Sequence, residues 1–178
     1  MKLIKKAEEQ ITLQDYSRKT FIKDVEIINL KRFNDDSGSF TELARVSSGI
    51  PELLPGFEIK QVNYSEMAPG TMKAFHIHKK QTDVWFVPPR DKILLILADI
   101  RKGSKTEDVI MRIPLGDCNS RIIKIPPGVA HGCKNISTET SRIIYFVSEI
   151  FSADPEICDE CRLSWDFLGK DIWDIEKE

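Results

Sequence analysis

Short runs of β-branched and aromatic residues, separated by turn signals, fill the chain from residue 25 onward. These runs span residues 25–33, 39–46, 56–66, 72–78, 83–88, 92–101, 108–114, 121–125 and 142–151. Glycine, proline and asparagine cluster between them, for example over residues 34–38 and 126–128, and such clusters end strands. The middle of the chain lacks the long helical patterns of a parallel βαβ fold. The pattern therefore predicts antiparallel strands in a sandwich or barrel.

Residues 1–22 follow a different pattern. They are polar and mixed, with only a weak helical spacing of Leu3, Ile4, Ala7 and Ile11. We expect an N-terminal arm over residues 1–22 and a β domain over residues 23–178, with short helical segments at the two ends. The length of 178 residues agrees with one such domain.

The period of two in a strand indicates which side chains share a face. One face of the run 56–66 carries Phe57, Ile59, Gln61, Asn63 and Ser65. In the run 72–78, His76 and His78 share a face in the same way. If these faces are interior, the barrel has an apolar floor and a polar mouth, which is typical of a ligand cavity.

Composition and charge exclude several classes of partner. Lys+Arg 26 against Asp+Glu 28 gives a net charge of −2, without the basic excess of a general nucleic-acid binder. The apolar stretch Ile93–Ala98 is far shorter than the roughly 20 residues of a membrane-spanning helix. The charged N-terminus does not resemble a signal peptide, so the four cysteines fit free thiols. We expect a cytoplasmic protein that binds neither nucleic acid nor membranes.

The three histidines of the chain fall into two short motifs. These resemble the cupin motifs G-x5-H-x-H-x(3,4)-E and P-x-G-x2-H-x3-N. The first matches Gly70, His76, His78 and Asp83, and the second matches Pro126, Gly128, His131 and Asn135. In metal-binding cupins the matching positions hold a divalent ion. The resemblance therefore implies a transition-metal site made of His76, His78, Asp83 and His131, in which Asp83 replaces a longer glutamate.

A second resemblance, within the same superfamily, covers about residues 25–175. Five segments resemble, in order, motifs of the dTDP-4-dehydrorhamnose 3,5-epimerases. They are Asp35–Glu42, Gln61–Ser65, Gly70–His76, Asp99–Ser104 and Ile125–Gly132. The resemblance implies an all-β, cupin-type antiparallel β-barrel or jelly roll. It also implies a homodimer in which each chain lends part of its active site to its neighbour.

The same resemblance implies a reaction and the residues that carry it. The reaction is epimerisation of a nucleotide-linked 4-keto-6-deoxy sugar, by proton removal alpha to the ketone and without a cofactor. His76 matches the base, Asp166 its carboxylate partner, and Tyr145 the acid that returns the proton on the other face. Histidine suits this role because its ordinary pKa of about 6.5 lets it accept a proton at neutral pH. The substrate-binding residues implied are Phe40, Glu42, Gln61, Asn63, Lys73 and His131.

Several positions depart from the epimerase pattern. Ser37 and Lys73 stand where the family has arginines that hold the diphosphate, and Asp83 falls near a family lysine. A His76 bound to a metal ion cannot also act as the base. Three hypotheses therefore stay open: an epimerase-like isomerase, which we favour, a metal-dependent cupin enzyme, and a sugar-binding cupin without catalysis.

Overall fold

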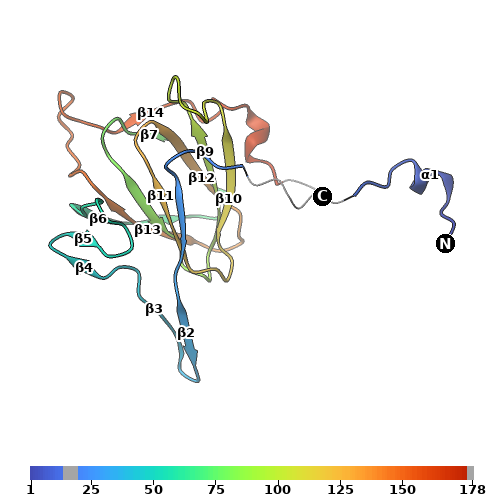
Figure 1. Ribbon diagram of the computed structural model, residues 1–178, viewed down its shortest axis with the longest axis horizontal. Coiled ribbons are helices and arrows are strands. Elements are labelled where there is room, and N and C mark those ends of the chain that lie inside the picture. The colour runs from blue at the N-terminus through green and yellow to red at the C-terminus, as the bar shows by residue number, and fades with distance from the viewer. Residues whose placement is uncertain (14–19, 176–178) are drawn as a thin grey trace.

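Two five-stranded antiparallel sheets form the body of the protein (Figure 1). The computed structural model describes residues 1–13 and 20–175. The first sheet has the order β1 (Glu26–Asn29), β11 (Arg121–Ile125), β8 (Asp83–Phe86), β13 (Ser141–Val147) and β6 (Gln61–Met67). The second has the order β10 (Ile110–Gly116), β9 (Lys92–Asp99), β12 (Val129–Asn135), β7 (Met72–Ile77) and β14 (Cys161–Arg162). The predicted all-β jelly roll is confirmed, as two separate sheets.

Smaller elements extend from this body. Two hairpins pair β2 (Arg32–Asp35) with β3 (Gly38–Thr41), and β4 (Val46–Ser47) with β5 (Ile50–Pro51). The two helical segments are α1 (Lys5–Glu8), which has no buried residue, and the 3₁₀ helix η1 (Lys170–Trp173). Within the described residues, no helix has both the length and the apolar character needed to cross a membrane.

Apolar side chains pack in three layers. The main core lies between the two sheets and includes Ile93, Leu95 and Leu97 of β9. The outer face of β9 is covered as well, because Leu94 and Ile96 pack with Phe75 and the Trp173 ring of η1. A strand that is buried on both faces needs apolar residues at consecutive positions. This double coverage explains the continuous apolar stretch Ile93–Ala98.

The outer face of the first sheet is covered by a third layer. Its buried members are Leu30, Leu54, Phe57, Val84, Phe86 and Ile122, and Ile59 packs against them. Phe57 and Ile59 therefore do not form the predicted apolar floor of a cavity, because both precede β6, which begins at Gln61. The alternation that we extended through residues 56–66 holds only within the strand itself.

Two other strand predictions differ from the structure. The expected run 25–33 is divided between β1, which pairs with β11, and β2, which forms a hairpin with β3. Strand β12 was not expected, because Gly132 and the polar residues around it hide the alternation. Gly132 allows close packing there: a Cβ atom at this position would lie 2.6 Å from the Ala74 Cβ atom and 3.0 Å from the Trp173 ring.

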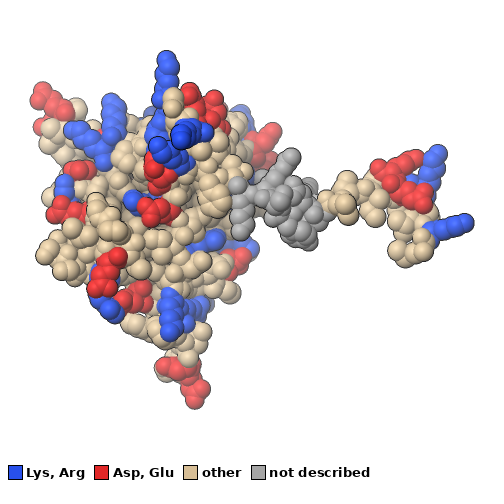
Figure 2. All heavy atoms as spheres, in the orientation of Figure 1, with Lys and Arg blue, Asp and Glu red and all other residues tan. Residues whose placement is uncertain are grey.

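Charged side chains of both signs are mixed on one face of the protein. On the face shown in Figure 2, lysine and arginine side chains alternate with aspartate and glutamate over the body of the protein. That face has no continuous basic surface among the described residues.

Candidate active site

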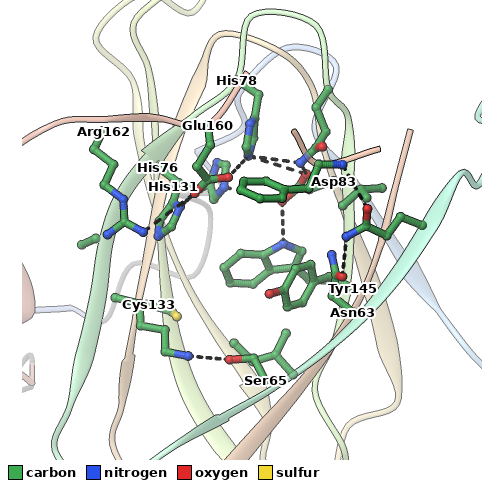
Figure 3. A pocket seen from close by; sticks show the side chains of 18 of the residues that line it. Asn63, Ser65, His76, His78, Asp83, His131, Cys133, Tyr145, Glu160 and Arg162 are labelled. Carbon is green, nitrogen blue, oxygen red and sulfur yellow. Dashed lines mark hydrogen bonds and ion pairs between the residues drawn. The ribbon is translucent and has the colours of Figure 1, made fainter. Parts of the chain in front are cut away.

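A cavity of about 580 Å³ opens between the two sheets (Figure 3). Strands β6, β8 and β13 of the first sheet and β7, β12 and β14 of the second contribute its walls. The polar faces predicted to meet do so here, because Gln61, Asn63 and Ser65 line the same cavity as His76 and His78. Its apolar lining includes Met72, Ala74, Trp85, Ile143, Val147 and Phe151. A concave space with a few convergent polar groups is the usual form of a small-molecule site.

His76 of β7 lies on one wall of this cavity and is bonded to a carboxylate. Its Nδ1 atom contacts the Glu160 Oε1 atom. The hydrogen bond from His76 lowers the pKa of Glu160, against the opposing effect of burial. Glu160 is therefore ionised at neutral pH, and it holds the Nδ1 proton of the imidazole. The Nε2 lone pair is then the one available to accept a proton.

The carboxylate that contacts His76 differs from the one that the resemblance implied. Asp166 accepts a hydrogen bond from the Ser164 hydroxyl, which lowers its pKa. It does not line the cavity. The reason lies in the pairing of β14 with β7, which sets Arg162 opposite His76 and brings Glu160, the residue just before β14, to the imidazole. The two matching motifs contained no signal for Glu160, because it lies outside both of them.

A second group of side chains lies deeper in the cavity and consists of His78, Asp83 and His131. The His131 Nε2 atom lies 3.6 Å from Asp83 Oδ2, and the His78 Nε2 atom lies 3.9 Å from Asp83 Oδ1. One potential metal-ligating atom from each of the three residues falls within 4.8 Å of the others. His76 is not part of this group, so the structure divides the four predicted metal ligands into a triad and a separate histidine.

Hydrogen bonds orient each member of the triad. His78 Nδ1 donates to the Asp159 carbonyl at 2.8 Å, and His131 Nδ1 donates to the Val129 carbonyl at 3.1 Å. Asp83 accepts from the Gln81 amide at 2.8 Å and from the Trp85 indole at 3.1 Å. Burial lowers the pKa of His131 to about 4, against the opposing charge of Asp83. His131 is therefore neutral at neutral pH.

The segment before β14 organises both histidines of β7. The backbone carbonyl of Asp159 accepts the hydrogen bond from His78. Its carboxylate also accepts hydrogen bonds from the backbone N–H groups of residues 79, 80 and 81, at 2.8–2.9 Å. Burial on its own would raise the pKa of Asp159, but these three bonds lower it. Asp159 fixes the loop after His78, and Glu160 fixes His76. Sequence reasoning missed both roles because the two segments are about 80 positions apart.

Tyr145 faces the cavity from the opposite sheet. It lies on β13, and its ring centroid is 6.0 Å from that of Trp85. Burial raises its pKa, and the negative charges of Asp83 and Glu160 raise it further. The phenol is therefore protonated at neutral pH. Figure 3 shows Tyr145 and Asn63 on one wall, and His76 and Glu160 on the other.

The predicted substrate-binding residues divide into two groups. Four of them line the cavity: Gln61, Asn63, Lys73 and His131. Phe40 and Glu42 do not, because Phe40 is exposed on the β2–β3 hairpin and Glu42 pairs with Arg45 at 3.1 Å. The structure therefore does not bring Phe40 and Glu42 to the cavity of their own chain.

Among the cavity residues, the polar contacts are local. The Gln61 amide donates to Asn63 at 2.7 Å and its oxygen accepts from the Phe151 N–H at 3.0 Å. The Lys73 ammonium donates to the Ser65 hydroxyl at 2.5 Å and lies 3.3 Å from the Glu66 carbonyl. Its contacts in the described chain are thus neutral, which leaves its charge available for an anion.

Comparison with known proteins favours one of the three hypotheses. The model of the family described as dTDP-4-dehydrorhamnose 3,5-epimerase matches residues 19–166. This chain belongs to that family. The favoured prediction of an epimerase-like isomerase is therefore confirmed at family level.

Curated relatives and a solved structure support this family assignment. The spore coat polysaccharide biosynthesis protein SpsL of Bacillus subtilis (strain 168) is 36% identical over 145 residues, which are 82% of this chain and 91% of that protein. A probable low-salt glycan biosynthesis epimerase, Agl13 of Haloferax volcanii, is 30% identical over 82% of this chain and 89% of its own length. A Legionella pneumophila dTDP-6-deoxy-D-glucose-3,5-epimerase, solved in complex with dTDP-4-keto-L-rhamnose, matches with a TM-score of 0.69 and 26% identity. That match covers 82% of this chain and 76% of the other.

Proposed function

We propose that this protein epimerises a dTDP-linked 4-keto-6-deoxy sugar at a carbon next to the ketone. The observation that carries the proposal is the His76–Glu160 pair on one wall of the cavity, facing the protonated Tyr145 on the other. Epimerisation requires a base on one face of the sugar and an acid on the opposite face. Residues of two different sheets supply these two positions.

In the proposed reaction, His76 Nε2 accepts the proton from the carbon next to the ketone. The electron pair of the broken C–H bond moves to the ketone oxygen, which becomes an enolate. Glu160 stabilises the imidazolium that forms, because a carboxylate bonded to Nδ1 favours the charged ring. Tyr145 then donates its proton to the opposite face of the same carbon, and exchange with solvent restores both side chains. No oxidation state changes, so the step calls for no redox cofactor.

Substrate binding is proposed to divide the cavity between sugar and diphosphate. Gln61 and Asn63, adjacent to Tyr145 across β6 and β13, present amide groups suited to sugar hydroxyls. Lys73 and the exposed Arg162 supply positive charge at the cavity for the diphosphate. A lysine binds phosphate as a point charge, without the two-pronged contact of an arginine. The Legionella relative, solved with a dTDP-linked keto sugar, supports this class of ligand.

We further propose a homodimer in which the β2–β3 hairpin reaches the partner's cavity. The hairpin projects from the body (Figure 1) and exposes two phenylalanine rings, Phe33 and Phe40, 6.4 Å apart. Exposed aromatic side chains on an extended hairpin suit a contact with another chain. Phe40 and Glu42 would then contribute to a neighbour's site.

Mixed dimers test this arrangement. A His76→Gln chain has an inactive cavity but an intact hairpin, and a Phe40→Ala chain has the reverse. Mixing the two chains is expected to restore turnover to about a quarter to a half of the wild-type value per cavity, because each mixed dimer contains one complete site. If mixing restores no activity although mixed dimers form, the hairpin does not complete the partner's site.

The reaction itself is tested by incubation with dTDP-4-keto-6-deoxy-D-glucose in D₂O. We expect deuterium at a carbon next to the ketone and inversion at that carbon, both read by NMR. The control is dTDP-glucose, which has no ketone to acidify its C–H bonds and should take up no deuterium. Absence of exchange at saturating keto sugar, with protein purified without chelator, would refute the proposed function.

A further inference from the structure

We propose that His78, Asp83 and His131 bind a divalent transition-metal ion in the cavity, and that His76 stays outside the metal site. In the sequence, the roles of metal ligand and of catalytic base competed for His76. In the structure, different side chains can carry these two roles. Binding of the ion stands on the geometry alone. Only the catalytic use of the ion rests on the proposed function.

The orientation of the two imidazoles supports a metal site. A backbone carbonyl can only accept a hydrogen bond, so His78 Nδ1 and His131 Nδ1 must both carry the proton. The nitrogen that each ring turns toward Asp83 is therefore Nε2. Metal-ligating histidines typically donate their other N–H to a carbonyl or carboxylate in this way, which fixes the tautomer.

The burial of the triad also supports a metal site. The three residues are only 4%, 3% and 2% exposed. Among the described residues, the contacts of Asp83 are the Gln81 amide, the Trp85 indole and the two imidazoles, and none of these carries a permanent positive charge. A buried carboxylate requires a compensating charge or several hydrogen bonds. A divalent ion held between Asp83 and the two Nε2 atoms supplies that charge.

The distances fit such an ion. Ligand atoms bonded to one zinc-like ion at about 2.0–2.2 Å lie roughly 3.0–3.6 Å from one another. The His131 Nε2–Asp83 Oδ2 and His78 Nε2–Asp83 Oδ1 distances are 3.6 and 3.9 Å, and one ligand atom from each of the three residues lies within 4.8 Å of the others. Binding would therefore draw the three side chains together by about 1 Å or less. All three residues line the cavity, which leaves the remaining coordination positions open to it. Two imidazoles and one carboxylate with open positions suit zinc, iron, manganese, cobalt or nickel.

A metal ion at the triad would also offset the negative charge of Asp83, which is unfavourable for the proposed reaction. The enolate oxygen is anionic, and Asp83 puts a negative charge on the wall of the same cavity. A divalent ion beside Asp83 makes the local charge positive, and positive charge near a developing oxyanion lowers the barrier. His76 is adjacent, because its ring stacks on His131 with centroids 5.9 Å apart. Base and ion can therefore act on the same sugar.

Cobalt(II) titration of the full chain tests the metal site. After treatment with a chelator and removal of the chelator, wild-type protein is expected to bind one equivalent of Co(II) with visible d–d absorption. Asp83→Asn should weaken binding by about 100-fold or more, because it removes the charged ligand at nearly constant shape. His76→Gln is the matched control, a histidine of the same cavity outside the triad, and should keep the cobalt spectrum. Near-ultraviolet circular dichroism identifies any variant that fails to fold.

The outcomes separate the metal site from the proposed function. Absence of a Co(II) spectrum in wild type, or an unchanged affinity in folded Asp83→Asn, overturns the metal site. For the catalytic use, stripping the metal should slow deuterium exchange into the keto sugar by about 100- to 1000-fold, and added metal should restore it. If removal of the metal leaves the rate of deuterium exchange unchanged, the proposed catalytic use of the ion is wrong. One bound Co(II) without exchange in any metal state supports the site and refutes the proposed function.

Discussion

Replacing Glu160 by glutamine tests whether its carboxylate assists His76 as the base, because the change removes a charge and leaves the shape of the side chain nearly unchanged. In the proposed reaction Glu160 stabilises the imidazolium of His76. A hydrogen bond to a charged group contributes about 1.5–3 kcal/mol. Each 1.36 kcal/mol corresponds to a tenfold change in rate, so Glu160→Gln should lower kcat by about 10- to 150-fold. KM should change little, because Glu160 acts through His76 rather than by holding the substrate.

The assay is steady-state epimerisation with the keto sugar, with kcat and KM separated. Asp166→Asn is the matched control, since it is also a carboxylate-to-amide change in the C-terminal segment but affects a side chain that bonds to Ser164 and does not line the cavity. We expect wild-type kcat for this control. The opposite result, a normal kcat in Glu160→Gln and a large loss in Asp166→Asn, would refute the assignment of Glu160 and restore the pairing suggested by the sequence.

Three further predictions concern the acid, the stability at low pH and the packing of β12. Tyr145→Phe should reduce inversion by about 100- to 10,000-fold while deuterium exchange on the His76 face continues; equal loss of both would place Tyr145 in another role. Asp99 is fully buried and its pKa is lowered, because hydrogen bonds from Arg101, Ser104 and Thr106 outweigh the effect of burial. Its contribution to the free energy of unfolding is therefore present above its unfolded pKa near 4 and is lost as the pH falls below that value. Asp99→Asn should cost about 1.5–3 kcal/mol at pH 7 and flatten the acid dependence in urea titrations, and an unchanged pH profile would contradict this. Gly132→Ala should lower stability by about 1–3 kcal/mol through overlap with Ala74, and an unchanged urea midpoint would contradict the close packing.

The sequence predicts the cavity well where a strand is regular. Alternation within β6 and β7 placed Gln61, Asn63 and His76 on faces that meet. The same rule failed for Phe57, because strand geometry begins only at Gln61 and periodicity does not mark where a strand starts. Strand β12 was missed because the close contact with Ala74 and Trp173 requires glycine at position 132, and this glycine interrupts the alternating pattern.

The partner of His76 could not be predicted from a local pattern. Glu160 reaches His76 only because the two-residue strand β14 pairs with the edge of β7. Such a short strand carries no periodic signal. The separation of His76 from the triad likewise depends on which ring nitrogens meet Glu160, Asp159 and Val129, and these contacts form between distant segments.

The central claim is that His76 removes the proton next to the ketone. The measurement that tests it most directly is the rate of deuterium incorporation from D₂O into dTDP-4-keto-6-deoxy-D-glucose, followed by mass spectrometry, in wild type and in His76→Gln at saturating substrate. The account predicts rapid incorporation in wild type and a loss of at least about 100-fold in His76→Gln, with the fold retained. Incorporation at the wild-type rate in His76→Gln would contradict it.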